Sequence, residues 1–279
     1  MAQDRATSED RQQETRRDEV DDETISDVIR DIVEKSDPYD ERVVCYAQPI
    51  FDTHTESYRQ AEVLMRLKIG NEIVGPSRFI PMAEKNGSIF RLTYILLNKV
   101  CSAMKELSKK CDFDRITVNF PPVFFCNEDM LKNLCNIMKM HGTDTNKLGV
   151  ELTEQALEDR DDVKNRVSSM TNAGIKLYLD DFGTGYSSMA RIVTYPFSVI
   201  KIDKGLLDTA MKYQCMEELI SIIIRVLKKN GYEILMEGVE DENGKKFSMD
   251  TKVDYIQGFL YERPVPLEKL ENYFAPATT

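Results

Sequence analysis

KLGVELTEQALEDRDDVKNRVSSMTNAGIKLYLDD, residues 147–181, contains two β-rich runs, 147–152 and 175–181, on either side of a helical pattern over 160–173. Short runs of this kind predict strands, and apolar residues repeated at three- and four-residue intervals predict helices. The same alternation extends along the chain from about Val43. The other predicted strands cover 43–50, 59–69, 115–120, 198–202, 232–237 and 253–257, and the other predicted helices cover 90–109, 128–140, 210–229 and 266–273.

Eight strands with intervening helices predict an α/β fold. Their number and the chain length match a (β/α)₈ barrel, which typically needs about 250 residues. The connection over 51–58 is too short for a helix, so the first two strands can pair as an antiparallel hairpin. An open, doubly wound sheet is the competing architecture, because it needs no eight-fold strand count.

The N-terminal segment differs from the rest of the chain. Residues 1–24 contain almost no large apolar side chain, so they cannot offset the entropy of ordering and are predicted to be a disordered acidic tail. The segment 25–42 is predicted to be a short amphipathic helix with a linker, and its helix can dock on its own domain or on a partner. Its apolar stripe consists of Ile25, Val28, Ile29, Ile32 and Val33. The barrel domain is expected over 43–274.

Composition excludes several classes of protein. The longest apolar stretch, around Leu219 to Leu227, is interrupted by Ser221 and Arg225 and is shorter than the roughly 20 residues that cross a bilayer. We therefore expect no membrane partner. The formal net charge is −11 and no basic run occurs, which argues against binding of duplex nucleic acid. Six cysteines without a CxxC pair, and no apolar leader at the start, indicate reduced thiols and a cytoplasmic location.

Polar side chains recur where the predicted strands end. In a barrel, the C-terminal ends of the strands open onto one face, and that face holds the active site. Several carboxylates, amides and one lysine are therefore expected to converge there. These residues are Glu62 within the second strand and Asn119, Glu151, Asp180, Asp181, Lys201, Glu237 and Gln257 at later strand ends.

Carboxylates at close quarters repel one another and take up protons unless cations compensate their charge. A site with oxygen ligands and no histidine or thiolate selects Mg²⁺ or Mn²⁺ over Zn²⁺. Each residue also has a structural alternative, since a single acidic residue at a strand end is usually a helix cap or a solvated loop residue. Asn119 could cap a turn, and Lys201 could lie on the surface. The recurrence of such polar residues over consecutive strands favours a metal-binding active site.

Nine segments carry a more specific pattern. They are AQPIF (47–51), EVLMR (62–66), GPSRFIPMAEKNG (75–87), VNFPP (118–122), ELTE (151–154), DDFGTGYSS (180–188), IKID (200–203), MEGVE (236–240) and IQGFLYERP (256–264). In this order and spacing, the chain resembles the EAL-domain cyclic-di-GMP phosphodiesterases over residues 43 to 274. The resemblance implies a modified (β/α)₈, TIM-like barrel whose first strand is antiparallel.

The resemblance also implies an activity: hydrolysis of the bacterial second messenger cyclic-di-GMP to linear pGpG with two divalent cations, Mg²⁺ or Mn²⁺. The implied catalytic residues are Glu62, Lys201 and Glu237. The implied metal ligands are Glu62, Asn119, Glu151, Asp180, Asp181 and Glu237. Arg66 would hold the phosphate, while Gln257, Gln48 and Glu240 would contact the guanine or shape its pocket. Glu154 would brace the loop after strand five, and that loop and the following helix could support a homodimer.

The chain departs from the family pattern at several positions without losing an implied ligand. Val63 replaces an alanine in the signature, and Pro121 stiffens the loop beside Asn119. Two other functions therefore stay open. One is a catalytically weak or inactive EAL-fold cyclic-di-GMP receptor or protein-interaction module. The other is a barrel lyase with Lys201 as a Schiff base, which is disfavoured because neighbouring carboxylates keep a lysine protonated.

Overall fold

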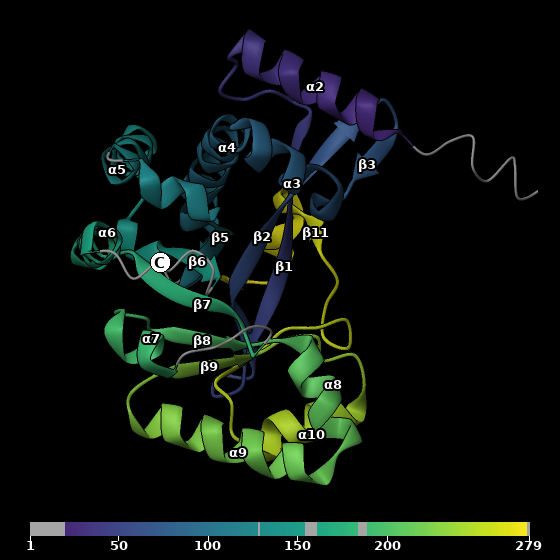
Figure 1. Ribbon diagram of the computed structural model, residues 1–279, viewed down its shortest axis with the longest axis vertical. Coiled ribbons are helices and arrows are strands. Elements are labelled where there is room, and N and C mark those ends of the chain that lie inside the picture. The colour runs from purple at the N-terminus through teal and green to yellow at the C-terminus, as the bar shows by residue number, and fades with distance from the viewer. Residues whose placement is uncertain (1–19, 128, 154–160, 184–188, 278–279) are drawn as a thin grey trace, which may run out of the picture. The chain divides into compact units, whose positions relative to one another are not determined.

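The computed structural model describes residues 20–127, 129–153, 161–183 and 189–277 (Figure 1). The chain divides into two compact units. Unit 1 comprises Met1–Val44 and Met65–Ile95, and unit 2 comprises Cys45–Leu64 and Leu96–Thr279. Most of the predicted acidic tail, residues 1–19, lies outside the described residues.

The strands are β1 (Val43–Asp52), β2 (Ser57–Ile69), β3 (Glu72–Val74), β4 (Cys111–Asp112), β5 (Arg115–Asn119), β6 (Leu148–Thr153), β7 (Lys176–Phe182), β8 (Val199–Ile202), β9 (Glu233–Met236), β10 (Tyr255–Ile256), β11 (Val265–Pro266) and β12 (Ala275–Pro276). The helices are α2 (Asp22–Lys35), α3 (Pro76–Asn86), α4 (Ile89–Lys110), α5 (Met130–His141), α6 (Asp161–Asn172), α7 (Met189–Thr194), α8 (Lys204–Lys212), α9 (Gln214–Lys229) and α10 (Glu242–Asp250). Short 3₁₀ helices cover Pro122–Cys126, Thr145–Lys147 and Leu267–Asn272.

A closed ring of strands forms the centre of unit 2. The order β1-β10-β9-β8-β7-β6-β5-β2 closes through the pairing of β1 with β2. Neighbouring strands from β2 through β5–β9 to β10 are parallel, whereas β1 runs antiparallel to β10. The modified (β/α)₈ barrel with an antiparallel first strand is therefore confirmed, and the open doubly wound sheet is wrong. Only residues 53–56 join β1 to β2, which explains why this connection holds no helix.

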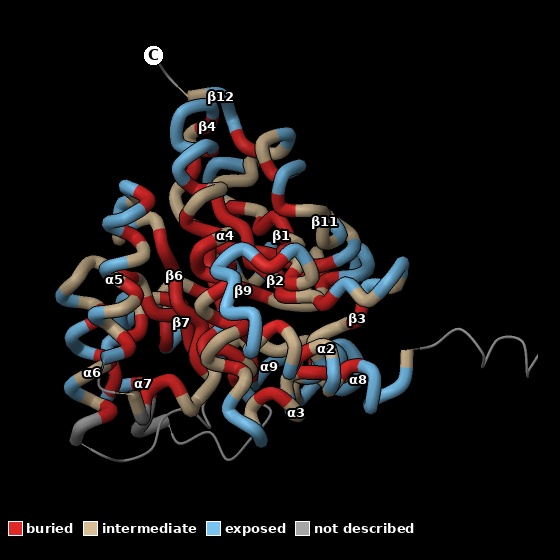
Figure 2. Tube along the Cα trace, turned by 90° about the horizontal axis from the view of Figure 1, so that it is seen from above, coloured by how far each residue is buried: buried red, intermediate tan, exposed pale blue. Residues whose placement is uncertain are grey.

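The barrel strands are buried along most of their length, as Figure 2 shows for β6 and β7. All four residues of β8 are buried. Parallel strands that are covered on both faces are expected to consist of nearly continuous apolar residues. Lys201 interrupts the run between Ile200 and Ile202. Because successive side chains in a strand point to opposite faces, Lys201 faces the side away from these two isoleucines.

Unit 1 contains the N-terminal helix. Asp21 caps α2 by accepting a hydrogen bond from the Thr24 amide at 2.8 Å. The helix packs against α3, and its three fully buried side chains are Ile25, Ile29 and Ile32. The backbone amide of Val20 donates to Glu72 at 3.0 Å, so the chain before α2 is also held. Within unit 1 the apolar stripe thus packs against the chain itself.

Several element boundaries differ from the predictions. The pattern over 210–229 predicted one helix, but Tyr213 adopts an extended conformation (φ −133°, ψ 116°) that separates α8 from α9. The predicted helix over 266–273 is a 3₁₀ helix, and the predicted strand over 253–257 shortens to β10. Over the described stretches, no helix combines the length and apolar character needed to span a membrane.

Candidate active site

The candidate site is built by the C-terminal ends of the barrel strands. Strand register aligns Asn119 of β5 with Glu151 of β6, and Thr153 of β6 with Asp180 of β7. Glu237 directly follows β9. Of the predicted residues that belong to unit 2, the structure brings Glu62, Asn119, Glu151, Asp180, Asp181, Lys201, Glu237, Gln257 and Gln48 together at this end.

Lys201 lies at the centre of the acidic residues. Its side chain is 1% exposed, and its Nζ lies 2.8 Å from Asp180 Oδ1 and 2.9 Å from Glu237 Oε1. It also contacts Glu151 Oε2, and Glu62 Oε2 lies 3.5 Å away. Burial opposes charging of this lysine, but the surrounding carboxylates raise its pKa well above the ordinary value. Lys201 is therefore an ammonium ion, which argues against a Schiff-base role.

A single ammonium leaves this cluster with excess negative charge. Burial, followed by the charge of Glu62, raises the pKa of Glu151 well above its ordinary value. Burial raises the pKa of Glu237 to about 8 and also raises the pKa of Asp181. Glu151 Oε1 is buried without a hydrogen-bond partner. Oxygen atoms in uncompensated excess, one of them unpaired, fit hard divalent cations.

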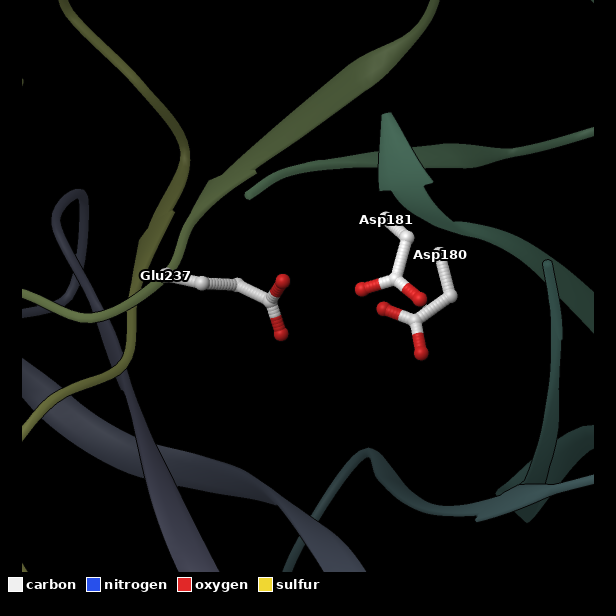
Figure 3. A group of neighbouring side chains, drawn as sticks. All are labelled: Asp180, Asp181 and Glu237. Carbon is white, nitrogen blue, oxygen red and sulfur yellow. The ribbon is translucent and has the colours of Figure 1, made fainter. Parts of the chain in front are cut away.

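Two neighbouring aspartates are turned toward the same space. Asp180, Asp181 and Glu237 each offer a carboxylate oxygen, and these atoms lie within 4.8 Å of one another (Figure 3). Adjacent residues of a regular strand would point to opposite faces. Here the pairing of β7 with β8 shifts between Leu179 and Phe182, and Asp181 has a φ of 56°. This irregularity at the strand end lets both aspartates face Glu237.

Amide side chains orient Glu62. Asn119 Nδ2 donates to Glu62 Oε1 at 2.7 Å, and Gln257 Nε2 donates to Glu62 Oε2 at 2.8 Å. Gln257 Nε2 also lies 3.1 Å from Gln48 Oε1, while Gln48 Nε2 donates to the Glu262 carbonyl at 2.9 Å. Both oxygens of this buried carboxylate are therefore engaged, which fixes its orientation.

A cavity of about 210 Å³ opens beside these residues. Its lining residues are Gln48, Glu62, Lys204, Glu237, Gly238, Glu240, Gln257, Gly258 and Phe259. Lys204 Nζ pairs with Glu240 at 2.7 Å. The Phe259 side chain is 46% exposed, and the Arg263 guanidinium lies 4.3 Å from its ring centre.

Sequence analysis missed Lys204, Gly238, Gly258 and Phe259 as lining residues. Gly258 must be glycine, because a Cβ at this position would lie 2.1 Å from the Val239 carbonyl oxygen. In the sequence, the signals for Gly258 were its position directly after Gln257 and its place within the segment IQGFLYERP (256–264). A close backbone approach of this kind is a common reason for glycine beside a site.

Two predicted residues are not part of this cluster as described. Arg66 belongs to unit 1, where its Nη1 donates to the Met65 carbonyl at 2.9 Å. Glu154, predicted to brace a loop, lies outside the described residues, as does the segment 184–188 of the DDFGTGYSS motif.

Comparisons with known proteins agree with this geometry. The profile of the EAL domain matches residues 36–264. The chain is 30% identical over 227 residues to the cyclic di-GMP phosphodiesterase PdeL of Escherichia coli (strain K12), covering 80% of this chain and 63% of the relative. It is 27% identical over 248 residues to the signaling protein YkoW of Bacillus subtilis (strain 168), covering 88% of this chain and 30% of the relative.

A solved structure described as the PaMucR phosphodiesterase in complex with c-di-GMP superimposes with a TM-score of 0.80 at 27% identity, covering 88% of this chain and 99% of that chain. An EAL domain protein from Listeria monocytogenes EGD-e shares the fold, with a TM-score of 0.79 at 24% identity and coverage of 91% and 97%. The chain spans 30% and 63% of the lengths of the two curated relatives.

Proposed function

This chain belongs to the EAL domain family, and we propose that it is a metal-dependent hydrolase that cleaves cyclic-di-GMP to linear pGpG. The observation that carries the proposal is the buried ammonium of Lys201 surrounded by four carboxylates at the C-terminal ends of the barrel strands. The relative PdeL is named as a cyclic di-GMP phosphodiesterase, and the PaMucR phosphodiesterase was solved in complex with c-di-GMP. Both findings support cyclic-di-GMP as the substrate.

The donor set supports two divalent cations, Mg²⁺ or Mn²⁺. We assign Glu62, Asn119, Glu151 and Asp180 to one ion, and Asp180 with Asp181 to a second. Glu237 is assigned either to the second ion or to proton transfer. Two such ions, when bound, lower the pKa of a bound water and neutralise charge on a phosphodiester oxygen.

The residues of the chain then have separate tasks. The Lys201 ammonium attracts the negative charge that develops on the attacking water oxygen. As that oxygen bonds to phosphorus, the P–O3′ bond breaks, and the water proton passes to the leaving 3′-oxygen. In the second of its two proposed roles, Glu237 would accept the proton from the attacking water; its Oε1 lies 2.9 Å from Lys201 Nζ.

Substrate recognition is proposed for the cavity residues. The amides of Gln48 and Gln257 and the carboxylate of Glu240 can hydrogen-bond the edge of a guanine base. The Asn119 and Gln257 amides also donate hydrogen bonds to Glu62 and fix the orientation of its carboxylate. Arg66 is proposed to bind the phosphate from its EVLMR motif alone, because a guanidinium suits phosphate oxygens.

The first test measures product formation. Purified protein is incubated with cyclic-di-GMP and Mg²⁺, Mn²⁺ or EDTA, and the products are separated by chromatography. We expect metal-dependent appearance of pGpG and its loss with EDTA. Binding without product would instead favour the receptor alternative, and absence of both would refute the proposed function.

A variant connects the activity to this site. We expect Glu62→Ala to lower turnover at least 100-fold, because it removes a carboxylate that no neighbour can replace. Glu106→Ala is the matched control, since Glu106 is exposed and pairs with Lys109 in its own helix. Hydrolysis by Glu62→Ala at the rate of the control would contradict the assignment.

A further inference from the structure

A fully buried tyrosine lies beneath the candidate active site. Tyr178 belongs to β7 and precedes Asp180 by two residues, so the two side chains share the face of β7 that points into the barrel. It belongs to a cluster of buried side chains with one residue from each of four other barrel strands: Ile50, Val199, Leu235 and Tyr255. Burial raises the pKa of Tyr178, so its hydroxyl keeps the proton and remains a hydrogen-bond donor.

The hydroxyl of Tyr178 connects strands that are not neighbours in the sheet. It donates a hydrogen bond to Gln60 Oε1 at 2.6 Å and accepts one from Arg115 Nε at 3.0 Å. Gln60 belongs to β2 and Arg115 to β5. Because β5 and β6 separate β2 from β7 in the ring, the tyrosine forms a link across one side of the barrel. Gln60 is 1% exposed, so water does not compete for this hydrogen bond.

Strand β6, which the ring of Tyr178 must pass, has no side chain in its way. Gly149 lies in β6, two residues before Glu151. A Cβ at Gly149 would lie 2.8 Å from Tyr178 Cε2 and 2.6 Å from Thr117 Cγ2, closer than such atoms approach in folded proteins. Any other residue at position 149 would therefore displace the ring from its path to Gln60. Glycine at this position thus allows the tyrosine to reach across β6.

The four strands joined in this way carry the four proposed ligands of one metal ion. On β2, β6 and β7 the residue of the link precedes the ligand by two positions, and on β5 Arg115 precedes the ligand by four. These ligands are Glu62, Asn119, Glu151 and Asp180. Residues separated by two or four positions share one face of a strand, so the link forms the layer of the barrel interior directly below the ligands.

The ligands repel one another, and this repulsion acts to separate the strand ends. Lys201 contacts the three carboxylates of the set, Glu62, Glu151 and Asp180, but it supplies a single positive charge. A metal site tolerates displacements of only about 0.2 Å in its metal–ligand distances. A hydrogen-bonded link one layer below the ligands holds the strands at a fixed spacing before an ion binds.

We propose that Tyr178 is a positioning residue for the metal site, and that its link to Gln60 and Arg115 holds the four ligand-bearing strands at the spacing that one divalent cation requires. This inference rests on the proposed function, because it uses the metal ligands assigned there. A tyrosine that only filled the core would need no hydroxyl at this point. The hydroxyl should therefore affect the affinity for the ion, beyond any effect that it has on folding.

The first experiment measures Mn²⁺ binding to the full chain without substrate, by isothermal titration calorimetry. Tyr178→Phe keeps the ring and removes only the hydroxyl, and we expect it to weaken Mn²⁺ binding by about 10- to 100-fold, the usual effect of losing a group that orients metal ligands. Tyr232→Phe is the matched control, because the Tyr232 hydroxyl donates to the Ile192 carbonyl at 3.1 Å, at the opposite end of β9 from Glu237.

The outcomes of this titration separate the inference from the proposed function. Equal Mn²⁺ affinity of the wild type and Tyr178→Phe would overturn the positioning role and leave the metal site intact. A wild-type protein that binds no Mn²⁺ would overturn the metal site as well. Equal weakening by Tyr178→Phe and Tyr232→Phe would also overturn the proposal, because it would mean that any lost buried hydroxyl has this effect.

A double variant separates positioning from folding. Tyr178→Phe leaves Gln60 Oε1 buried without its donor, which by itself lowers stability. Tyr178→Phe combined with Gln60→Met removes both partners, so the free energy of unfolding of the metal-free protein in urea should return toward the wild-type value. Mn²⁺ binding should stay about 10- to 100-fold weaker than in the wild type. Recovery of Mn²⁺ affinity together with stability would show that the hydroxyl acts only through folding and would overturn the proposal.

Steady-state kinetics distinguish an effect on the ion from an effect on the substrate. For Tyr178→Phe, the Mn²⁺ concentration that gives half-maximal turnover should rise by the same factor as in the titration. The KM for cyclic-di-GMP at saturating Mn²⁺ should stay within about twofold of the wild-type value. An increase in KM with an unchanged dependence on Mn²⁺ would assign Tyr178 to substrate binding and would overturn its role at the metal site.

Discussion

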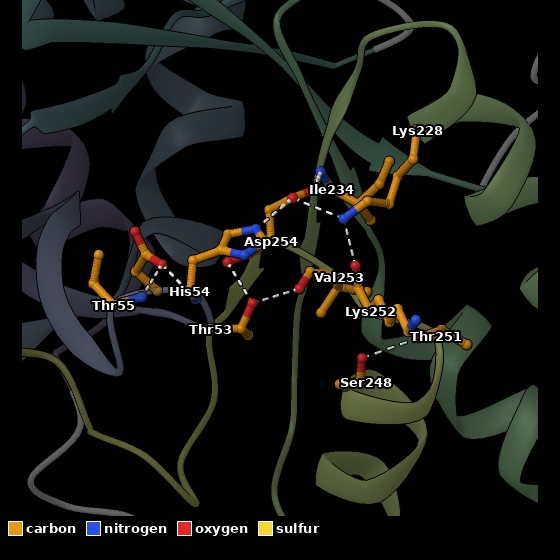
Figure 4. Close-up of polar contacts among 11 residues, drawn as sticks. Thr53, His54, Thr55, Lys228, Ile234, Ser248, Thr251, Lys252, Val253 and Asp254 are labelled. Carbon is orange, nitrogen blue, oxygen red and sulfur yellow. Dashed lines mark hydrogen bonds and ion pairs between the residues drawn. The ribbon is translucent and has the colours of Figure 1, made fainter.

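Asp254 connects four segments of unit 2, and its removal should measurably lower stability. Its side chain is 13% exposed and lies just before β10. It accepts a hydrogen bond from the Ile234 amide at 2.8 Å and from Lys228 Nζ at 2.7 Å, and His54 Nε2 lies 2.9 Å from its Oδ1 (Figure 4). Thr53 donates to the neighbouring Val253 carbonyl at 2.7 Å.

We expect Asp254→Asn to lower the free energy of unfolding by about 2 kcal/mol. The amide keeps the shape but loses the charge that binds Lys228, and hydrogen bonds to charged groups are worth about 1.5–3 kcal/mol. For a chain of 279 residues, about 2 kcal/mol corresponds to a fall of roughly 3–4 °C in Tm. The assay is urea unfolding at pH 7, and Asp250→Asn, an exposed aspartate in α10, is the control.

The effect should depend on pH in a defined direction. Burial opposes ionisation of Asp254, but hydrogen bonds from Lys228, His54 and Ile234 lower its pKa below the ordinary value. A lowered pKa in the folded state contributes stability above the unfolded-state pKa of about 4, and that stability is lost as the pH falls through the folded-state pKa. The difference between wild type and Asp254→Asn should therefore shrink below about pH 4. A difference that is absent at pH 7, or that grows on acidification, would refute this reasoning.

Three further predictions concern glycine packing, metal binding and the N-terminal helix. Gly258→Ala should destabilise the fold by about 3 kcal/mol or more in urea unfolding, because its Cβ would overlap the Val239 carbonyl oxygen, whereas Gly75→Ala meets no neighbour and should cost less than about 1 kcal/mol. Millimolar Mg²⁺ or Mn²⁺ should raise the Tm of the wild type, and Glu62→Ala should lose most of that rise; an equal rise in both would place the ions elsewhere. Ile29→Ala should cost about 2–4 kcal/mol, since this residue is fully buried in unit 1, and a cost below about 0.5 kcal/mol would mean that α2 adds little to the folded state.

The sequence alone predicted the barrel and where its polar residues would gather. Alternating strand and helix patterns predicted the fold because hydrophobic periodicity is a local property that can be read from the order of the residues alone. The short 51–58 connection predicted the hairpin that makes β1 antiparallel. The acidic residues were recognisable because each lies at a strand end, and a parallel barrel gathers all such ends on one face. Their roles in binding and catalysis remain predictions.

Tertiary structure decided the features that depend on non-local contacts. Neither periodicity nor spacing could tell that Lys201 would contact four carboxylates, because those residues come from four other segments of the chain. The turn of Asp180 and Asp181 toward the same space required the register shift between β7 and β8.

The cavity and the break in the predicted helix over 210–229 were also decided by the tertiary structure. Gly258 must be glycine because the Val239 backbone approaches it, and Tyr213 ends α8 where the chain turns to start α9. Which face of α9 stays exposed was likewise set by the packing of unit 2. A one-dimensional pattern records which residues can be buried, whereas only the folded chain determines which of them find a partner.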